Sequence, residues 1–256
     1  MTAADFETSP LLEASGFRHA FFTRRGGVST GAYASLSFST ASGDAPDHVS
    51  ENLARAARAL GVAPNMLYFL SQVHGREVLR VRGGEARDEV LRREGDAVVS
   101  GDAGVACAVR VADCVPLLVA DRASGAVAAA HAGWRGVAAG VAAESVRALR
   151  ALTGAEGALV AAIGPHISVD AFEVSDEVAQ TLRDASPDPD VVRPGPHGRP
   201  HVNLRKIIRA QLCEVGLRAQ DVDDVGGCTV GDPARYFSFR RDGKASGRHL
   251  AAIVAR

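Results

Sequence analysis

The sequence predicts a single-domain α+β fold, and three observations lead to that prediction. The chain has 256 residues, 46% of them hydrophobic, which is enough for one large core. Short runs rich in valine and leucine cluster in its middle, whereas stretches with helical spacing lie mostly outside that cluster. This separation favours α+β over a regular βαβ alternation. No repeat, low-complexity tract or linker divides the chain.

The predicted strands are short apolar segments separated by turn residues such as Gly83-Gly84 and Ser124-Gly125. They cover residues 67–73, 78–81, 97–99, 105–111, 115–120 and 126–130. Apolar residues recur at three- and four-residue spacing in the predicted helices, which cover residues 52–60, 137–152, 176–185 and 204–215. Residues 186–200 hold five prolines and are predicted as a long surface loop rather than a domain boundary.

Charge and hydropathy exclude several classes of protein. The formal net charge of −1 provides no long-range attraction for nucleic acid or for an anionic membrane. No apolar run approaches the roughly 20 residues of a membrane span, and the first ten residues do not resemble a signal peptide. Four cysteines do not make a disulfide scaffold in a chain of this length. We therefore expect a cytoplasmic protein in which Cys107, Cys213 and Cys228 are free, mostly buried thiols.

One local pattern points to a different chemistry. Residues 27–31 match the G-x-S-x-G nucleophile elbow of serine hydrolases. That chemistry needs a strand before the serine and a helix after it, but Arg24-Arg25 precede the segment and no helical period follows it. A polar glycine-rich loop is therefore the preferred interpretation of this segment.

Three residues of metal-ligand type, His74, Cys114 and His131, lie at the ends of predicted strands. Side chains at such positions can leave the sheet and converge on a cleft. Two imidazoles and one thiolate suit Zn²⁺, and three protein ligands leave the fourth position open, as catalytic zinc requires. Each residue also has a plainer interpretation, as a small buried hydrophobe or a satisfied polar group. The pattern therefore predicts a candidate metal site.

The surroundings of His131 predict an anion site next to it. Gly133 and Gly136 flank Trp134 and Arg135 at the expected junction of a strand and a helix. Such a junction exposes backbone N–H groups and the positive end of the helix dipole, and arginine adds a fork for bidentate phosphate contact. Close backbone packing is the alternative role of the glycines. A zinc position beside a phosphate position indicates an enzyme that acts on or with phosphate.

Six sequence blocks together resemble one family, described variously as multicopper polyphenol oxidase (laccase domain), purine nucleoside phosphorylase or peptidoglycan editing factor. The blocks are FFTRRGGVS (21–29), QVHG (72–75), ADCVPLL (112–118), AHAGWRG (130–136), IGP (163–165) and FSFRRDG (237–243). The similarity runs from about His19 to the C-terminus. It therefore defines residues 1–256 as a single catalytic domain, with residues 1–18 as an N-terminal extension.

The resemblance implies a layered α/β/β/α domain of mixed sheets with the helices outside. It also implies zinc, with copper as the second choice, on His74, Cys114 and His131. The implied activity is phosphorolysis of adenosine, inosine, guanosine and methylthioadenosine, with adenosine deamination as a side activity. The partners are then a nucleoside and inorganic phosphate. The chain departs from the family pattern at Ser37, at Asn203 and in the stretch that begins at His166, which leaves substrate preference open.

Further roles can be assigned within this hypothesis. Cys114 is expected as a thiolate, because coordination removes its proton. Arg135, Arg24 and Arg241 are the candidates for phosphate contact, on the strength of their charge and their glycine-rich or loop surroundings, and plain surface arginines are the alternative. Asp113 is the candidate for orienting a zinc ligand, and a turn carboxylate at a strand end is the alternative.

Three other functions compete with this one. A blue-copper laccase needs about ten histidines with H-x-H pairs, whereas this chain has eight histidines and no such pair. A peptidoglycan editing factor, which removes a misincorporated amino acid from a cell-wall precursor, would use the same three ligands. A protein without metal would use Cys114 as a redox sensor. Metal content separates the last possibility from the others, and a substrate panel separates the phosphorylase from the hydrolase.

Overall fold

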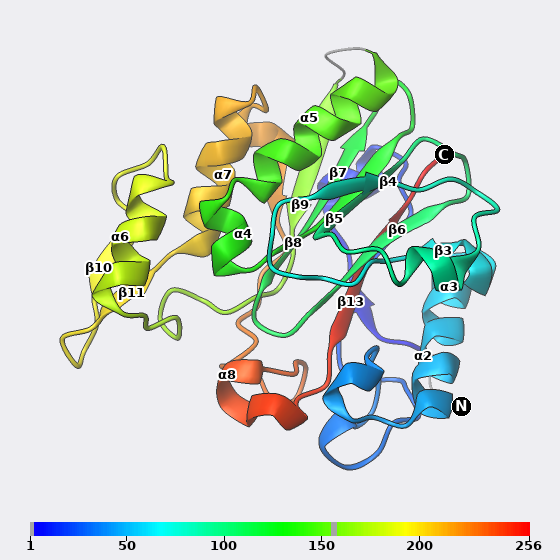
Figure 1. The fold of residues 1–256 in the computed structure, drawn as a ribbon, viewed down its shortest axis with the longest axis horizontal. Helices are drawn as coiled ribbons and strands as arrows, with labels where there is room; N and C mark the ends of the chain where they lie inside the picture. The colour runs from blue at the N-terminus through cyan, green and yellow to red at the C-terminus, as the bar shows by residue number, and fades with distance from the viewer. Residues whose placement is uncertain (1–2, 155–157) are drawn as a thin grey trace.

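The computed structural model describes residues 3–154 and 158–256, and Figure 1 shows their arrangement. Two mixed β-sheets pack face to face. One outer face is covered by helices α4, α5 and α7, with α6 beside them against the β10-β11 hairpin, and the opposite outer face is covered by helix α2. The predicted α+β domain with α/β/β/α layers is therefore confirmed.

The larger sheet has six strands in the order β12-β9-β7-β8-β5-β4 among the described residues. Its central strands β7, β8 and β9 are antiparallel, while β12 and β4 pair in parallel at the two edges. The strands are β4 (Val78–Arg80), β5 (Ala97–Ser100), β7 (Val115–Asp121), β8 (Val127–Ala132), β9 (Leu159–Ile163) and β12 (Val222–Asp224).

The smaller sheet has the order β1-β2-β13-β6-β3. Its strands are β1 (Phe6–Glu7), β2 (His19–Phe22), β3 (Leu67–Tyr68), β6 (Ala106–Val111) and β13 (His249–Val254). The C-terminal strand β13 pairs antiparallel with both β2 and β6, so the two ends of the chain meet in this sheet. A separate hairpin is formed by β10 (Val192–Pro194) and β11 (Pro200–Val202).

The longer α-helices, α2, α5, α6 and α7, are amphipathic and bury one side. The α-helices of the described residues are α1 (Pro10–Ala14), α2 (Pro46–Ala59), α3 (Arg87–Val90), α4 (Trp134–Ala138), α5 (Val141–Thr153), α6 (Asp176–Asp184), α7 (Leu204–Glu214) and α8 (Phe239–Asp242). No helix of the described part of the chain has the length and apolarity that a bilayer crossing requires.

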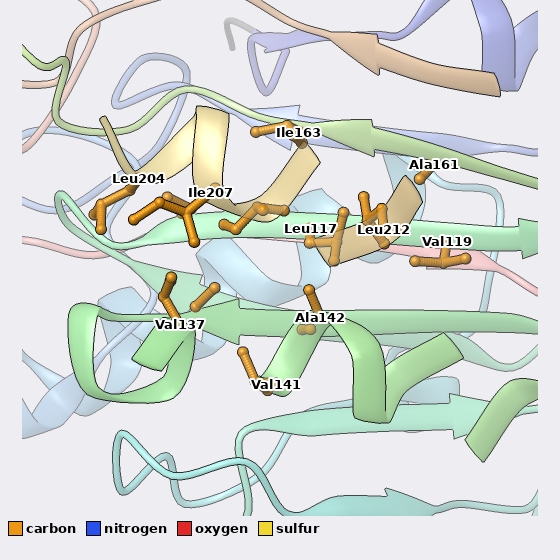
Figure 2. Close-up of a cluster of buried hydrophobic side chains, with 14 of the residues drawn as sticks. Leu117, Val119, Val137, Val141, Ala142, Ala161, Ile163, Leu204, Ile207 and Leu212 are labelled. Atoms are coloured by element: carbon orange, nitrogen blue, oxygen red, sulfur yellow. The ribbon is translucent and has the colours of Figure 1, made fainter. Parts of the chain in front are cut away.

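Three apolar clusters correspond to the three interfaces between layers. Under α4, α5 and α7, side chains such as Val137, Val141 and Ile207 pack on Leu117 and Val119 of β7, as Figure 2 shows. The second cluster fills the space between the two sheets, and the third lies under α2. Alternate residues of each central strand face opposite sides, because the side-chain period of a strand is two.

Most of the predicted central strands are present with shifted ends. The segment predicted at 67–73 forms only β3, and Ser71 adds a single isolated bridge. The helix predicted at 137–152 is two helices, because Gly140 adopts a left-handed conformation with φ 81° between α4 and α5. The helix predicted at 52–60 begins earlier, since Pro46 at the first helical position has a suitable φ angle.

The strands outside the central cluster were not predicted. They are β1, β2, β9, β11, β12 and β13, and residues 186–200 contain β10 instead of being loop throughout. The N-terminal segment also takes part in the fold. β1 pairs with β2, and Leu12 and Phe17 are buried in the cluster between the sheets.

Candidate metal centre

The three predicted ligands meet at one end of the space between the two sheets. Cys114 lies in the short connection from β6 to β7, and His131 lies near the end of β8. Side chains alternate along a strand, so Cys114 and His131 lie on the same face of the larger sheet as Leu118 and Ala129, which pack between the two sheets. His74 reaches the same point from the segment between β3 and β4. The structure therefore brings all three together, as the sequence predicted.

The distances between the donor atoms fit a metal ion. One donor atom from each residue lies within 4.8 Å of the other two, and Cys114 Sγ is 4.0 Å from His74 Nε2. Donors of a tetrahedral zinc ion lie roughly 3.3–3.8 Å apart, given bonds of about 2.0–2.3 Å. Side-chain adjustments of less than about 1 Å would complete the geometry. His131 is buried, Cys114 is half-buried and His74 is exposed, so the centre is open on one side.

Asp96, which the sequence interpretation missed, orients two of the three ligands. Its carboxylate accepts a hydrogen bond of 2.7 Å from His131 Nδ1, which leaves Nε2 of that ring for a metal. It also accepts bonds from the backbone N–H groups of Val73, His74 and Gly75. Burial alone would raise the pKa of Asp96, but these bonds lower it, so the group is a carboxylate. An acidic residue directly before a buried strand was the available signal.

The charges of Cys114 and His131 are coupled. Burial alone would raise the pKa of the Cys114 thiol, yet the imidazoles of His131 and His74 lower it to about 6. Burial alone would lower the pKa of His131, whereas Cys114 and Asp96 raise it to about 9. Each group therefore favours the charged form of the other, which is a thiolate beside an imidazolium. Such a thiolate is ready to bind a cation that displaces the imidazolium proton.

Two glycines of the HAGWRG block leave room for this arrangement. A Cβ atom at Gly133 would lie 2.7 Å from the His74 ring and 3.1 Å from Cys114 Sγ. A Cβ atom at Gly136 would lie 2.8 Å from the carbonyl oxygen of Gly75. Close packing, one of the two roles considered for these glycines, therefore holds for both. His74 itself has a φ of 62°, a left-handed conformation that its loop imposes.

The centre forms the base of a cavity of about 470 Å³. Its walls combine apolar side chains, among them Trp134, Ile167, Phe172 and Phe239, with four arginines, Arg110, Arg135, Arg240 and Arg248. Of the described residues that line it, Asp113 is the one acid. A chain of almost zero net charge therefore contains a strongly cationic cavity beside its candidate metal ligands.

Of the three arginines predicted to contact phosphate, only Arg135 lines this cavity. Arg24 donates instead to the carbonyl oxygens of Ala34 and Pro233, and it packs over the Phe237 ring. Arg241 donates to the carbonyl oxygens of Thr229, Val230 and Tyr236 and pairs with Asp242. Both guanidinium groups thus bond carbonyl oxygens of loops and do not line this cavity, and their contact with phosphate stays a prediction.

Asp113 has a different position from the one predicted. Its carboxylate accepts bonds of 2.6 Å from the Thr229 hydroxyl and from the backbone N–H of Arg240. It therefore fixes the segment that carries α8 against the cavity, while Asp96 contacts the ligand residues. Sequence alone did not distinguish these two carboxylates, because both lie next to strand ends.

The positions that depart from the family pattern have structural roles. Ser37 is fully buried beside the backbone of Arg248, and Asn203 caps the N-terminus of α7 by accepting from the Lys206 N–H. His166 lies outside the cavity lining and hydrogen-bonds the carbonyl oxygen of Gly164. Burial lowers its pKa to about 4, so its ring is neutral at pH 7.

The cysteines are free thiols in the structure, in agreement with the prediction. The four cysteines differ in burial, however. Cys107 is buried, Cys114 and Cys228 are half-buried, and Cys213 is exposed on α7. The expectation that the cysteines other than Cys114 are mostly buried therefore holds only for Cys107.

Fold and site together define an α+β protein with a His/Cys/His centre of metal-ligand type at the base of an arginine-lined cavity. A family model described as multi-copper polyphenol oxidoreductase laccase matches residues 18–256. The chain belongs to this family, which confirms the resemblance carried by its sequence blocks.

Relatives of known name cover nearly the whole chain. A protein of Deinococcus radiodurans named purine nucleoside phosphorylase is 38% identical over 95% of this chain and 92% of its own length. Purine nucleoside phosphorylase YfiH of Escherichia coli K12 is 38% identical over 90% of both chains. The crystal structure of YlmD from Geobacillus stearothermophilus is 31% identical, covers 100% of both chains and superposes with a TM-score of 0.89.

Proposed function

We propose that this protein is a zinc-dependent purine nucleoside phosphorylase, with zinc held by His74, Cys114 and His131. The observation that carries the proposal is the three-donor centre, which opens into a cavity lined by four arginines that have no carboxylate partner among the described residues. The relatives named purine nucleoside phosphorylase support the same activity. The substrates proposed are adenosine, inosine, guanosine and methylthioadenosine together with inorganic phosphate, and adenosine deamination is proposed as a side activity.

The donor set suits zinc better than copper. A thiolate and two imidazoles are the ligands of catalytic zinc, and the exposed side of the centre provides the open fourth position. When bound, zinc supplies a Lewis acid that polarises an oxygen atom of the substrate or of phosphate. Among the described residues one such cluster of donors is present, whereas a multicopper oxidase needs several.

The residues of the chain supply binding and orientation. Trp134, Phe172 and Phe239 offer apolar surface on which a purine ring can lie, since bases stack on aromatic side chains. The arginines offer charge to phosphate. Asp96 holds His131 and the backbone around His74 in place, so the ligand atoms keep their position during turnover.

The test is phosphate-dependent turnover of inosine by the Cys114→Ala variant. We expect the wild-type protein to release hypoxanthine only when phosphate is present. The variant should lose bound zinc and at least about 1,000-fold in activity while it remains folded, because two neutral imidazoles hold zinc poorly and the large core does not need metal to close it. Metal analysis and circular dichroism check these expectations.

The matched control is Cys213→Ala, which removes an exposed thiol on α7 and should change neither zinc content nor turnover. Full phosphate-dependent activity in Cys114→Ala would refute the zinc assignment. Turnover of a cell-wall precursor without turnover of any nucleoside would replace the phosphorylase by the peptidoglycan editing hydrolase, which uses the same ligands.

A further inference from the structure

Arg110 and Arg248 lie on the same face of the smaller sheet. Strand β13 pairs with β6 so that Leu250 is opposite Arg110, and Arg248 precedes Leu250 by two residues. Since side chains alternate along a strand, Arg248 and Arg110 are diagonal neighbours on one face. Farther along the two strands, the same face carries Ala108 and Ala252, which are buried under α2. The two arginines therefore lie at the end of an apolar strip, where the sheet borders the cavity.

The backbone of Arg110 is held firmly on both sides. Gln72 accepts a hydrogen bond from the Arg110 N–H through Oε1 and donates to its carbonyl oxygen through Nε2, each at 2.8 Å. The Arg110 guanidinium packs over the Phe69 ring at 4.5 Å from the ring centre. The Arg248 guanidinium lies over Phe239, 5.6 Å from its centre. Both charged groups are thus positioned by packing before any ligand arrives.

Neither guanidinium has an acidic partner. No carboxylate of the described residues lies within 4.0 Å of Arg110 or Arg248. Arg248 donates through Nη1 to the carbonyl oxygens of Ser246 and Gly247, and its Nε and Nη2 have no acceptor within the described residues. Arg110 donates through Nη2 to the carbonyl oxygen of Leu70, over a long 3.4 Å. Several charged donors thus remain available to a ligand.

Placing two unneutralised cations side by side is unfavourable unless an anion joins them. Burial, together with repulsion by Arg248 and Arg87, lowers the pKa of Arg110 to about 10. The group still carries its full charge at pH 7. Arg248 is also close enough to Cys114 and Asp113 to be affected by their charges, so the pair lies next to the candidate metal centre.

We propose that Arg110 and Arg248 form an oxyanion subsite that binds inorganic phosphate beside the metal centre. As the co-substrate site of a phosphorylase, this subsite rests on the proposed function. Guanidinium groups match phosphate because their N–H donors are planar and paired, and charge-assisted bonds of this kind are strong. The free Nε and Nη2 of Arg248 make one complete fork. Arg135 and Arg240, both exposed at the cavity mouth, add positive potential that attracts the anion.

The experiment measures phosphate binding by equilibrium dialysis with radiolabelled phosphate and zinc-loaded protein, in the absence of nucleoside. We expect Arg248→Gln and Arg110→Gln each to raise the dissociation constant for phosphate at least about tenfold, the loss typical of one charge-assisted contact. In turnover, the KM for phosphate should rise by a similar factor while the KM for inosine changes less than about twofold.

Three further variants serve as controls. Arg147→Gln removes an exposed arginine on α5 that pairs with Glu144, and it should leave phosphate binding unchanged. Arg110→Lys and Arg248→Lys keep the charge and the packing stem but lose the fork, so they cover the case in which a glutamine variant does not fold. Each should weaken phosphate binding by an amount between wild type and the glutamine variant.

The possible outcomes separate the subsite from the proposed function. If phosphate binds with the expected arginine dependence but no nucleoside is turned over, the subsite stands and the phosphorylase proposal falls. If inosine is phosphorolysed and every Arg110 and Arg248 variant keeps its phosphate affinity, the subsite falls. If adenosine monophosphate binds in an arginine-dependent way and inorganic phosphate does not, the subsite belongs to a phosphorylated ligand and the proposal is overturned.

Discussion

Two cavities of this protein are each lined by four arginines, yet their chemistry differs. The larger one, of about 620 Å³, is formed by Arg122, Arg147, Arg150 and Arg218 near the C-terminal end of α5. Asp221 pairs there with both Arg122 and Arg218, and Glu144 pairs with Arg147. In the cavity above the candidate metal centre, no arginine has an acidic partner among the described residues.

The difference teaches that the number of arginines does not define an anion site. A carboxylate partner occupies part of the N–H donors of a guanidinium group and offsets its positive charge. A guanidinium group without such a partner offers both to a ligand. The carboxylate near the metal centre, Asp96, bonds backbone N–H groups and His131 instead of arginines. The pairing of charges, not their count, distinguishes the two cavities, and the following predictions test this view.

The largest expected effect is a loss of stability at acidic pH. Its source is His249, which lies on the side of the candidate site. His249, next to Arg248, accepts a hydrogen bond from the Phe237 N–H through Nε2 and is buried, and burial lowers its pKa to about 4. In the unfolded chain the pKa of this histidine is about 6.5, so between pH 4 and pH 6.5 the folded state binds fewer protons than the unfolded state. Its stabilising contribution is therefore complete above pH 6.5 and is lost as the pH falls to 4, by about 3 kcal/mol.

Denaturant unfolding across pH 4–7 measures this effect. His249→Gln should flatten the pH dependence of the free energy of unfolding, while His197→Gln, at an exposed position, should preserve it. An unchanged slope in His249→Gln would show that this histidine is not a source of acid sensitivity.

Asp96→Asn is expected to have the next largest effect. The amide keeps the size of the side chain but cannot accept from three backbone N–H groups and His131 with a full negative charge. We expect zinc affinity to fall by 10- to 100-fold, as is typical when the partner of a ligand histidine is lost. Competition with a chelator measures the affinity. Asp221→Asn, in the other cavity, is the control, and equal zinc affinity in the two variants would contradict the role given to Asp96.

A smaller effect is expected when a carboxylate is added to the cavity of the candidate site. Ser71 lines it together with Arg110. Ser71→Asp should neutralise part of the local charge, as Asp221 does in the other cavity, and raise the KM for phosphate about tenfold. Ser71→Asn has nearly the same size and should leave that KM within about twofold. If both variants behave alike, shape rather than charge controls phosphate binding.

The smallest effect is expected in the larger cavity itself. Asp221→Asn removes the charged partner of Arg122 and Arg218. The Asp221 carboxylate is buried, Arg122 is half-buried and Arg218 is exposed. The amide keeps the size of the side chain and one acceptor oxygen, and solvent around Arg218 screens the lost charge, so the melting temperature should fall by no more than about 2–4 °C. Nucleoside turnover should be unaffected. A large loss of activity would indicate that this cavity communicates with the candidate site.

Much of the fold could be predicted from local pattern. The strands β5, β6, β7 and β8 consist mostly of valine, leucine and alanine, and such apolar runs are typical of strands buried on both faces. β9 (LVAAI) and β13 (HLAAIV) were not predicted, although their composition resembles that of the predicted strand β8 (VAAAHA). Their strand conformation depends on partners distant in the chain.

The sequence by itself determined the type and the local setting of the candidate ligands. A histidine or cysteine at the end of a buried strand, with glycines beside it, can be recognised from a few neighbouring residues. His74, Cys114 and His131 were predicted in this way, and they are found together. Gly133 and Gly136 belong to the same local signal, because their neighbours in space include the ligand loop.

Only the tertiary structure decided which charged residues serve the site. Arg110 and Arg248 become neighbours through the pairing of β6 with the C-terminal strand β13, and Asp96 meets His131 through the pairing of β5 with β8. Arg24 and Arg241 have equally promising local sequence but bond to carbonyl oxygens elsewhere. The physical reason is that the environment of a charge depends on its neutralising partners, and long-range strand pairing brings those partners within reach.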